Sequence, residues 1–304
     1  MDMEENSMSM DIFLQHLLNG ISVGSLYALI AIGYTMVYGI LLLINFAHGD
    51  IFMMASYFMI FAMVDFGLPV WVSLPLIIVL TVVLGMLLER SAYKPLRSAP
   101  RMSIMISAIG ASYLLENLAT YLFTGVPKGY PDIPWLTKVI NIGNISFQIV
   151  TVIAPVLVIL ILAGLMTLVN HTKTGMAMRA VSKDFETARL MGVKIDRIIA
   201  ATFAVGSGLA AVGSVLWGAK YSSVYPLMGV MPGLKCFVAA VFGGIGNIPG
   251  AVLGGIVLGL GETLLVAFFP GLTGYRDAFA FVVLIVMLLV RPNGLLGEKA
   301  TDKV

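Results

Sequence analysis

The sequence has little charge and no soluble stretch of any length. Only 11% of its 304 residues are charged, whereas a soluble domain typically has about 25%. Hydrophobic residues make up 59%, and the longest polar interval is residues 170–197. A separate soluble domain is therefore excluded. The composition predicts an all-α polytopic membrane protein, with residues 1–304 forming a single transmembrane domain.

The sequence also lacks the residue patterns of catalytic, metal and nucleotide sites. The single cysteine, Cys236, excludes an intrachain disulfide and a cysteine-based metal site. There is no GxxxxGK[ST] phosphate loop, no metal-ligand spacing, and no nucleophile with a base beside it. We therefore expect no enzyme, no cofactor or metal bound by this chain, and no nucleic-acid partner.

The first nineteen residues are acidic where a cleavable signal would be basic. Residues 1–11 carry four acidic residues and no basic one, whereas a signal peptide begins with positive charge. We expect residues 1–19 to form an N-terminal segment that is retained, with residues 11–19 lying at the membrane surface.

Long apolar runs divide the rest of the chain. A membrane-spanning helix needs about 18 or more apolar residues. The runs cover residues 20–43, 51–64, 69–88, 102–123, 147–169, 198–217, 232–242, 251–269 and 278–290. Nine crossings result if the short run 232–242 crosses, and eight result if one broken segment is re-entrant. We favour nine.

Basic residues gather in three intervals. Residues 89–101, 171–197 and the tail 291–304 hold four, six and three of the eighteen Lys and Arg. Basic loops remain on the cytoplasmic side of a membrane. The tail is therefore expected inside, and nine crossings then put the acidic N-terminus outside.

Two segments interrupt the apolar runs with polar residues and glycine. The interrupting residues are Asn45, His48, Gly49 and Asp50 in the first segment, and Gly243, Gly244, Gly246 and Gly250 in the second. Irregular backbone at membrane depth must be covered by protein or water, and a pair of such segments points to a transport pathway. The alternative is two tight turns at the cytoplasmic surface. His48 and Asp50 are either a proton relay or a pair that holds the break closed.

Charged and amide groups also lie within the apolar runs. These are Glu116 with Asn117, and Glu262. A carboxylate in mid-span costs roughly 2.5–3.5 kcal/mol on insertion scales, so it needs water or a partner. Either these groups line an aqueous pathway or a subunit contact, or Ser, Thr or Asn of a neighbouring helix satisfies them. Lys235 is expected near the outer face, with its ammonium reaching the surface.

The polar interval 170–197 contains the pattern of a short helix outside the membrane. Asp184 is placed to cap it, Glu186 lies in its first turn and Arg189 in its last, and Gly192 lies just past its end. That order complements the helix dipole and allows a left-handed residue at the C-terminus.

The same residues resemble a known loop. Glu186, Thr187 and Ala188, three further residues and Gly192 are similar to the EAA-x-x-x-G loop of ABC importer permeases. In that superfamily the short helix docks on an ATP-binding subunit. Thr187 replaces the usual second alanine and is small enough to preserve docking. The alternative is an ordinary basic loop without a partner.

A wider resemblance covers residues 12–297. Five segments resemble the LivH family of branched-chain amino-acid permeases in order and spacing: 44–50 (INFAHGD), 233–235 (GLK), 241–251 (VFGGIGNIPGA), 275–277 (YRD) and 291–297 (RPNGLLG). The resemblance implies an ABC importer permease in the cytoplasmic membrane of a bacterium or archaeon.

The family also implies partners. These are a LivM-like second permease, LivF-like and LivG-like ATPases that hold ATP and magnesium, and an extracytoplasmic protein that delivers leucine, isoleucine or valine. Relatives move urea, short amides or other amino acids, so the substrate stays open. An ion-coupled secondary transporter or a channel would need no docking helix, so residues 184–192 discriminate these alternatives.

Overall fold

The computed structural model describes residues 2–297, with side chains from Met10 onward. Helices dominate that range, as predicted. The long ones are α1 (Asp2–Leu41), α3 (Val70–Leu88), α4 (Arg101–Phe123), α6 (Ile149–His171), α9 (Ile195–Tyr221), α11 (Ile248–Phe268) and α12 (Arg276–Val290). The shorter ones are α2 (His48–Ile60), α5 (Pro134–Thr137), α7 (Lys173–Lys183), α8 (Phe185–Leu190) and α10 (Val230–Gly243).

Non-α turns and four small strands complete the described chain. The π-helical turns η1 (Phe61–Asp65) and η2 (Glu89–Tyr93) continue α2 and α3, and 3-10 turns form η3 (Lys94–Leu96) and η4 (Pro270–Tyr275). Strands β1 (Lys128–Gly129) and β4 (Ser223–Val224) pair antiparallel, as do β2 (Val139–Ile142) and β3 (Ile145–Gln148). The strands lie in polar connections, and no pattern in the sequence predicted them.

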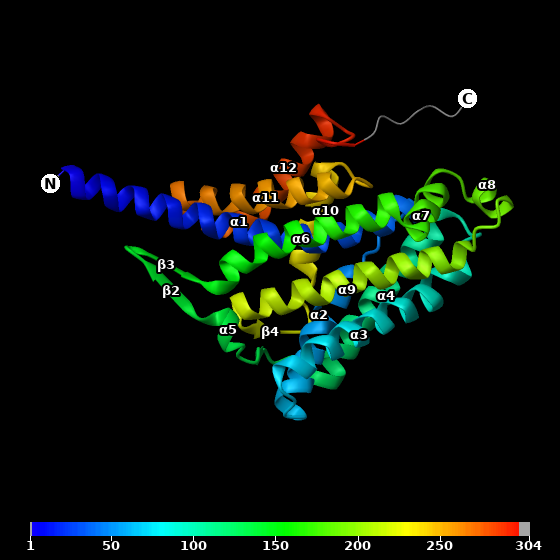
Figure 1. The fold of residues 1–304 in the computed structure, drawn as a ribbon, viewed down its shortest axis with the longest axis horizontal. Coiled ribbons are helices and arrows are strands. Elements are labelled where there is room, and N and C mark those ends of the chain that lie inside the picture. The colour runs from blue at the N-terminus through cyan, green and yellow to red at the C-terminus, as the bar shows by residue number, and fades with distance from the viewer. Residues whose placement is uncertain (1, 298–304) are drawn as a thin grey trace.

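Seven helices of the described chain are long and apolar enough to cross a membrane. Two shorter apolar segments, α2 with η1 and α10, lie among them, so nine helical segments match the predicted runs. Several of the long helices run side by side along the molecule (Figure 1). The prediction of an all-α polytopic membrane protein is confirmed.

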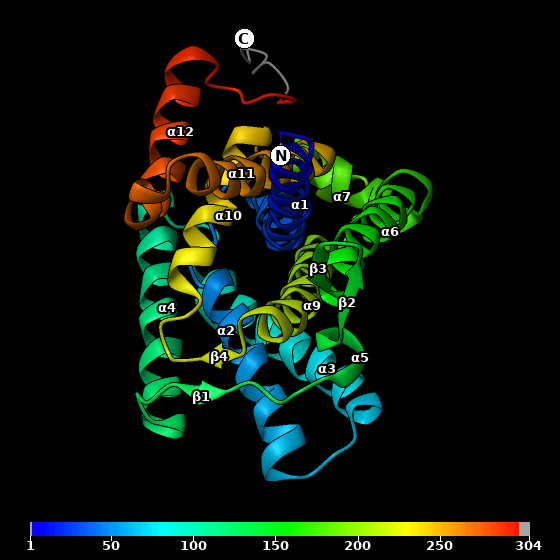
Figure 2. The same ribbon diagram turned by 90° about the vertical axis from the view of Figure 1, so that its left-hand side faces the viewer.

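Helix α1 is the centre of the bundle. Of its apolar window 94% is buried, whereas only 11% is buried in the last span, residues 270–290. Figure 2 shows α1 in the middle, with α4 and α12 at the periphery. Peripheral helices expose large apolar side chains such as Tyr121 and Leu289, as helices facing lipid or another membrane subunit do.

Glycines bring the backbones of α1 and α11 into contact. Gly20, Gly24 and Ala28 recur every fourth residue on α1, and Gly255 and Gly259 do so on α11. A Cβ atom added to Gly259 would lie 2.2 Å from the backbone nitrogen of Gly24, and one added to Gly255 would lie 2.6 Å from that of Ala28. Small residues at this spacing permit close packing of membrane helices.

The contact between α1 and α11 yields a stability prediction. Gly259→Leu should lower the melting temperature of the purified protein, because the added side chain meets backbone and overpacking costs about 1–3 kcal/mol. Gly164→Leu on α6 is the matched control, since a Cβ atom there meets nothing within 4 Å. Equal melting temperatures for the two variants would contradict this packing account.

The predicted loops lie at two different ends of the molecule. At one end, the Gln15 amide donates to the Ser146 carbonyl at 3.0 Å, so the start of α1 lies beside the β2–β3 hairpin. At the other end, Lys94 and Arg97 bind Asp196 at 2.7 and 2.6 Å, which joins the basic interval 89–101 to the basic interval 171–197. We call these the hairpin end and the basic end. Two of the three basic intervals therefore lie together at one end.

The segments near the two termini are connected directly to the helical bundle. Residues 11–19 form no separate surface segment, because α1 runs through them without a break and Gly20 packs closely on Leu260 of α11. In the tail 291–304, the Leu295 and Leu296 amides donate to the Phe242 and Gly243 carbonyls. Residues 298–304 lie outside the described part.

The two breaks are confirmed but are shorter than predicted. The chain leaves helix at residues 42–47 and at residues 244–247. His48, Gly49 and Asp50 already belong to α2, and Gly250 belongs to α11, so Gly49 and Gly250 are not turn residues. They are glycines because backbone lies against them: a Cβ atom would be 2.5 Å from Gly229 O and 2.4 Å from Gly243 O, respectively. Gly244 and Gly246 do adopt positive φ angles, +108° and +96°.

Candidate functional site

The helix predicted from residues 184–192 is present as α8. The Asp184 carboxylate accepts hydrogen bonds from the backbone N–H groups of Glu186 and Thr187 at 2.9 and 3.3 Å, and from the Thr187 hydroxyl at 2.6 Å. Gly192 follows the helix with a φ of +83°, a left-handed conformation that favours glycine. Thr187, the departure from the family pattern, therefore strengthens the cap.

A preceding helix, α7, was not predicted. Its Thr172 hydroxyl accepts from the Gly175 N–H at 3.0 Å, which caps it directly after α6 ends. Gly175 lies so close to the end of α6 that a Cβ atom would be 2.2 Å from Leu168 O. Helix α8 is thus connected to α6 through a tightly packed corner.

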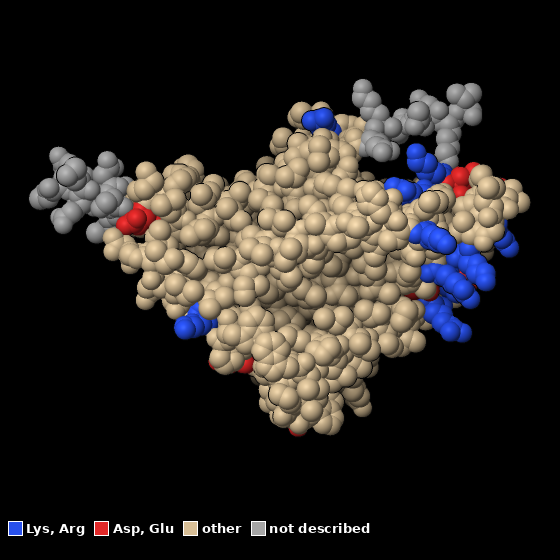
Figure 3. All heavy atoms as spheres, in the orientation of Figure 1, with Lys and Arg blue, Asp and Glu red and all other residues tan. Residues whose placement is uncertain are grey.

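One side of α8 faces outward with apolar side chains. Leu190 and the following Met191 are 87% and 80% exposed, whereas Ala188 is buried. Glu186 and Arg189 are also exposed. Basic side chains gather around this end of the molecule (Figure 3), so the exposed pair lies in polar surroundings. Exposed apolar groups rimmed by polar ones mark an interaction surface.

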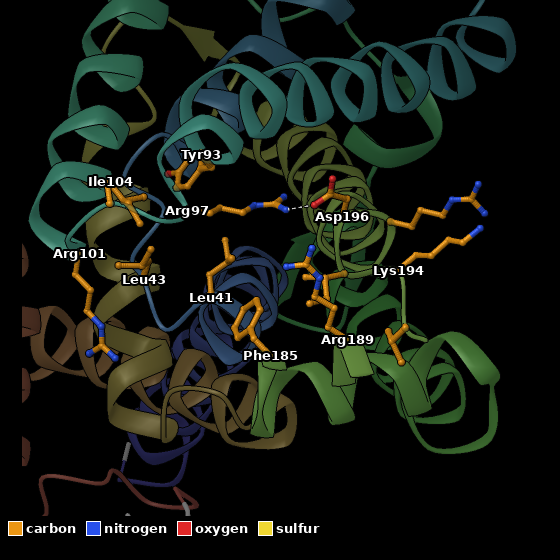
Figure 4. A pocket seen from close by; sticks show the side chains of 14 residues that line it. Leu41, Leu43, Tyr93, Arg97, Arg101, Ile104, Phe185, Arg189, Lys194 and Asp196 are labelled. Carbon is orange, nitrogen blue, oxygen red and sulfur yellow. Dashed lines mark hydrogen bonds and ion pairs between the residues drawn. The ribbon is translucent and has the colours of Figure 1, made fainter. Parts of the chain in front are cut away.

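The other side of α8 borders a cavity of about 870 Å³ at the basic end. Phe185 and Arg189 of α8 line it together with Leu41 of α1, and Arg97 extends across it to Asp196 (Figure 4). Arg97 also pairs with the buried Glu89. This ion-pair network ties the end of α3 to the start of α9, beside the helix that could dock a partner.

A second cavity lies between the helices. It measures about 570 Å³ and is lined by α1, α2, α4 and α10 and by the segment before α10, with mostly apolar walls. Its polar groups include Tyr34, Asp50, Ser112 and Glu116. Asp50 is buried and accepts a hydrogen bond from the Ser112 hydroxyl. We call this the central cavity. A cavity of this size with few polar groups suits a small ligand.

The structure divides the predicted pathway residues. Asp50 and Glu116 line the central cavity, but Asn117 does not: it is exposed on the outer face of α4, and its amide donates to the Tyr113 carbonyl at 2.7 Å. Asn45 accepts from the Tyr93 hydroxyl at 2.7 Å. Only some of the residues predicted to line the pathway therefore lie near one another.

His48 and Asp50 point to different neighbours. The His48 ring packs edge-on against Tyr34 at 4.7 Å between centroids, and it fills the space that Gly33 leaves. No hydrogen bond joins His48 to Asp50 within residues 10–297. The arrangement supports neither a relay nor a lock made by this pair.

Glu262 has a partner that the sequence reading missed. Its two carboxylate oxygens lie 3.0 and 3.1 Å from the Lys235 ammonium, and one accepts from the Tyr27 hydroxyl at 3.0 Å. Lys235 is 5% exposed, so the prediction that its ammonium reaches the surface was wrong. Lys235 and Glu262 carry opposite charges in consecutive apolar runs, and this could have indicated that they pair. Pairing lowers the free-energy cost of burying each charge.

Comparison with known proteins agrees with this architecture. The family described as "Branched-chain amino acid transport system / permease component" matches residues 16–288. The chain belongs to this permease family. It is therefore a transporter component and not an enzyme.

Individual relatives match over nearly the full length. The chain is 42% identical to the high-affinity branched-chain amino acid transport system permease protein LivH of Escherichia coli K12, and 40% identical to BraD of Pseudomonas aeruginosa. Each match covers 96% of this chain and 98% of the relative. A probable LivH of Methanocaldococcus jannaschii is 27% identical over 90% of this chain and 89% of the relative. No solved structure matches the chain.

The central cavity yields a prediction for transport. Glu116→Gln should lower uptake by roughly two- to tenfold, the effect of losing a polar contact worth about 0.5–1.5 kcal/mol. Asn117→Ala, on the outer face of the same helix, should leave uptake near wild type. Initial uptake rates at equal protein levels measure both. An unchanged rate for Glu116→Gln would remove this carboxylate from the pathway.

Proposed function

We propose that this chain is the membrane-spanning subunit of an ABC importer that moves branched-chain amino acids into the cell. The relatives named above are permeases of such amino acids and match over almost the whole chain. The central cavity supports the substrate class: its mostly apolar wall suits an aliphatic side chain, and two carboxylates suit an ammonium group. Neutral urea or short amides would gain less from Asp50 and Glu116.

The shape and exposure of α8 support the proposal that transport is coupled to ATP hydrolysis by partner subunits. A six-residue helix, capped at both ends, presents Leu190 and Met191 to solvent beside Glu186 and Arg189. A helix held out from the bundle with exposed apolar ends suits insertion into a groove of another protein. We therefore assign α8 as the docking element for LivF-like and LivG-like ATPases, which bind ATP and magnesium.

The remaining partners follow from the same proposal. A LivM-like permease pairs with this chain within the membrane, and an extracytoplasmic binding protein delivers the amino acid. The basic end then faces the cytoplasm, as basic loops do, with residues 291–297 and the C-terminus inside. The hairpin end faces the binding protein, and the membrane is the cytoplasmic membrane of the cell.

A mechanical route runs from α8 to the central cavity. Movement of α8 acts on α6 through the corner at Gly175, and on α9 through the short connection that follows Gly192. Helix α9 packs on α1, α2 and α3, and α2 carries Asp50 into the cavity. ATP-driven displacement of the docked helix thereby changes the walls of the pathway.

Gly192 tests the coupling directly. Gly192→Val places a β-branched residue at a φ of +83°, a strain of about 1–3 kcal/mol that displaces the end of α8. Uptake and substrate-stimulated ATP hydrolysis should fall together by roughly fivefold or more, corresponding to about 1 kcal/mol of lost coupling. Proteoliposomes containing the complete complex measure both activities.

Gly67→Val is the matched control. Gly67 also has a positive φ, +62°, and open space around it, but it lies between α2 with η1 and α3, in the turn that precedes α3. Its variant should keep uptake and hydrolysis coupled. Normal coupled uptake in Gly192→Val would refute the docking role, and uptake that needs no ATP would favour an ion-coupled transporter.

The exposed end of α8 gives a test of assembly. Leu190→Glu should reduce copurification of the ATPase subunits by roughly tenfold, because docking would then bury an unpaired carboxylate in an apolar contact. Ile142→Glu changes a similarly exposed residue at the hairpin end and should leave copurification unchanged. Undiminished ATPase binding by the Leu190 variant would place the contact elsewhere.

A further inference from the structure

A third cavity adjoins the central one on the side of the hairpin end. It measures about 400 Å³ and lies where α9 ends and α12 begins. Its wall includes Tyr27, Trp217, Tyr225, Lys235, Arg276 and Asp277. Tyr225 and Met231 belong to the walls of both cavities, so only the start of α10 and the segment before it separate the two spaces. We call this third space the vestibule.

The charges around the vestibule are balanced. The Lys235 ammonium binds Glu262 at 3.0 Å and Asp277 at 2.7 Å, and Arg276 supplies a second cation. Two cations and two carboxylates sum to zero. Balanced, separated charges suit a ligand that carries one of each.

Arg276 is the member of this group without a side-chain hydrogen bond or ion pair in the described part of the chain. Its Nε atom is buried and makes no hydrogen bond, and no ion pair involves its guanidinium among the described side chains of residues 10–297. Burying part of a guanidinium without an acceptor is costly. Guanidinium groups bind carboxylates through two parallel hydrogen bonds. Arg276 is therefore placed to receive a carboxylate that enters the vestibule.

Asp277 and the aromatic residues offer the complementary contacts. The Asp277 side chain is 52% exposed and uses Oδ1 for Lys235. Its other oxygen accepts no hydrogen bond from residues 10–297 and is available to an ammonium group. Trp217 lies between Tyr27 and Tyr221, at 6.2 and 4.5 Å between ring centroids. This row, with Met228 and Met231, gives an apolar surface for an aliphatic side chain.

We propose that the vestibule is a binding site for a free zwitterionic α-amino acid before it passes into the central cavity. Arg276 receives the α-carboxylate, Asp277 receives the α-ammonium, and the aromatic row receives the side chain. This inference rests on the proposed function and deepens it, because it gives the permease a recognition site of its own for amino acids.

Protection from chemical labelling tests binding without relying on transport. Ser223 lines the vestibule and is exposed, so Ser223→Cys creates a reactive thiol there, whereas the native Cys236 is fully buried. The complete complex, without nucleotide or binding protein, is treated with a membrane-impermeant maleimide and increasing leucine. Leucine should slow labelling at position 223 at least fivefold at saturation. Ser146→Cys, exposed on the β2–β3 hairpin, should label at an unchanged rate.

Ligand analogues and a second substitution separate binding from a structural change. Leucinol lacks the carboxylate and 4-methyl-2-oxopentanoate lacks the ammonium, so each should need at least tenfold higher concentration than leucine to protect. Adding Arg276→Gln should raise the protective leucine concentration at least tenfold, and Arg276→Lys should restore part of it. Lys138→Gln removes an exposed charge at the hairpin end and should change nothing.

The outcomes distinguish this proposal from the one it rests on. If the wild-type complex takes up leucine with ATP but leucine never protects position 223, the vestibule proposal is overturned and the importer stands. Protection by leucine that is equal in Arg276→Gln also overturns it. If the wild-type complex takes up no amino acid at all, the importer proposal itself has failed.

Discussion

The contact between the backbones of α1 and α11 organises the bundle. Lipid supplies no hydrophobic force between helices, so membrane helices associate through close packing and polar contacts. Glycines at every fourth position allow that approach, and a Cβ atom at Gly24, Gly255 or Gly259 would meet backbone within 2.6 Å. Because α1 is thereby buried at the centre, α9, α10 and α11 surround it and leave α4 and α12 outside. The two cavities beside α10 exist because the helices lining them are held around this fixed core.

A second constraint is that no polar group can be left uncovered at membrane depth. The break at residues 42–47 is covered where Tyr93 binds Asn45 and where His48 packs on Tyr34. The break at residues 244–247 is covered by the tail, whose amides bind the end of α10. The buried charges Lys235 and Glu262 neutralise each other. Asp50, Glu116 and Arg276 are charged side chains that line a cavity, and of these three only Asp50 has a side-chain hydrogen bond, from the Ser112 hydroxyl, within the described chain. Incomplete pairing at these positions is consistent with a pathway for a charged small molecule.

The local features of this fold follow from sequence, since they depend on neighbouring residues. Apolar run length predicted the spans, basic residues predicted which loops share an end, and Asp184 with Gly192 predicted α8 and its caps. Features set by distant contacts were missed. Gly49 and Gly250 were assigned to the breaks because a sequence does not distinguish a glycine needed for a positive φ from one packed against another helix. The partners of Glu262 and the exposure of Asn117 depend on how each helix is rotated about its axis. A helix that is apolar on all sides has no polar face from which that rotation could be predicted. Both cavities are built from residues far apart in the chain.

The central claim is that this permease works as part of an ATP-driven complex. The most direct test is to isolate the tagged chain from membranes of its native host in a mild detergent and identify the proteins that copurify. The account predicts two ATPase subunits and a second permease in defined ratio, with leucine uptake that depends on ATP after reconstitution. Isolation of the chain alone, together with leucine uptake into liposomes in the absence of ATP, would contradict the account.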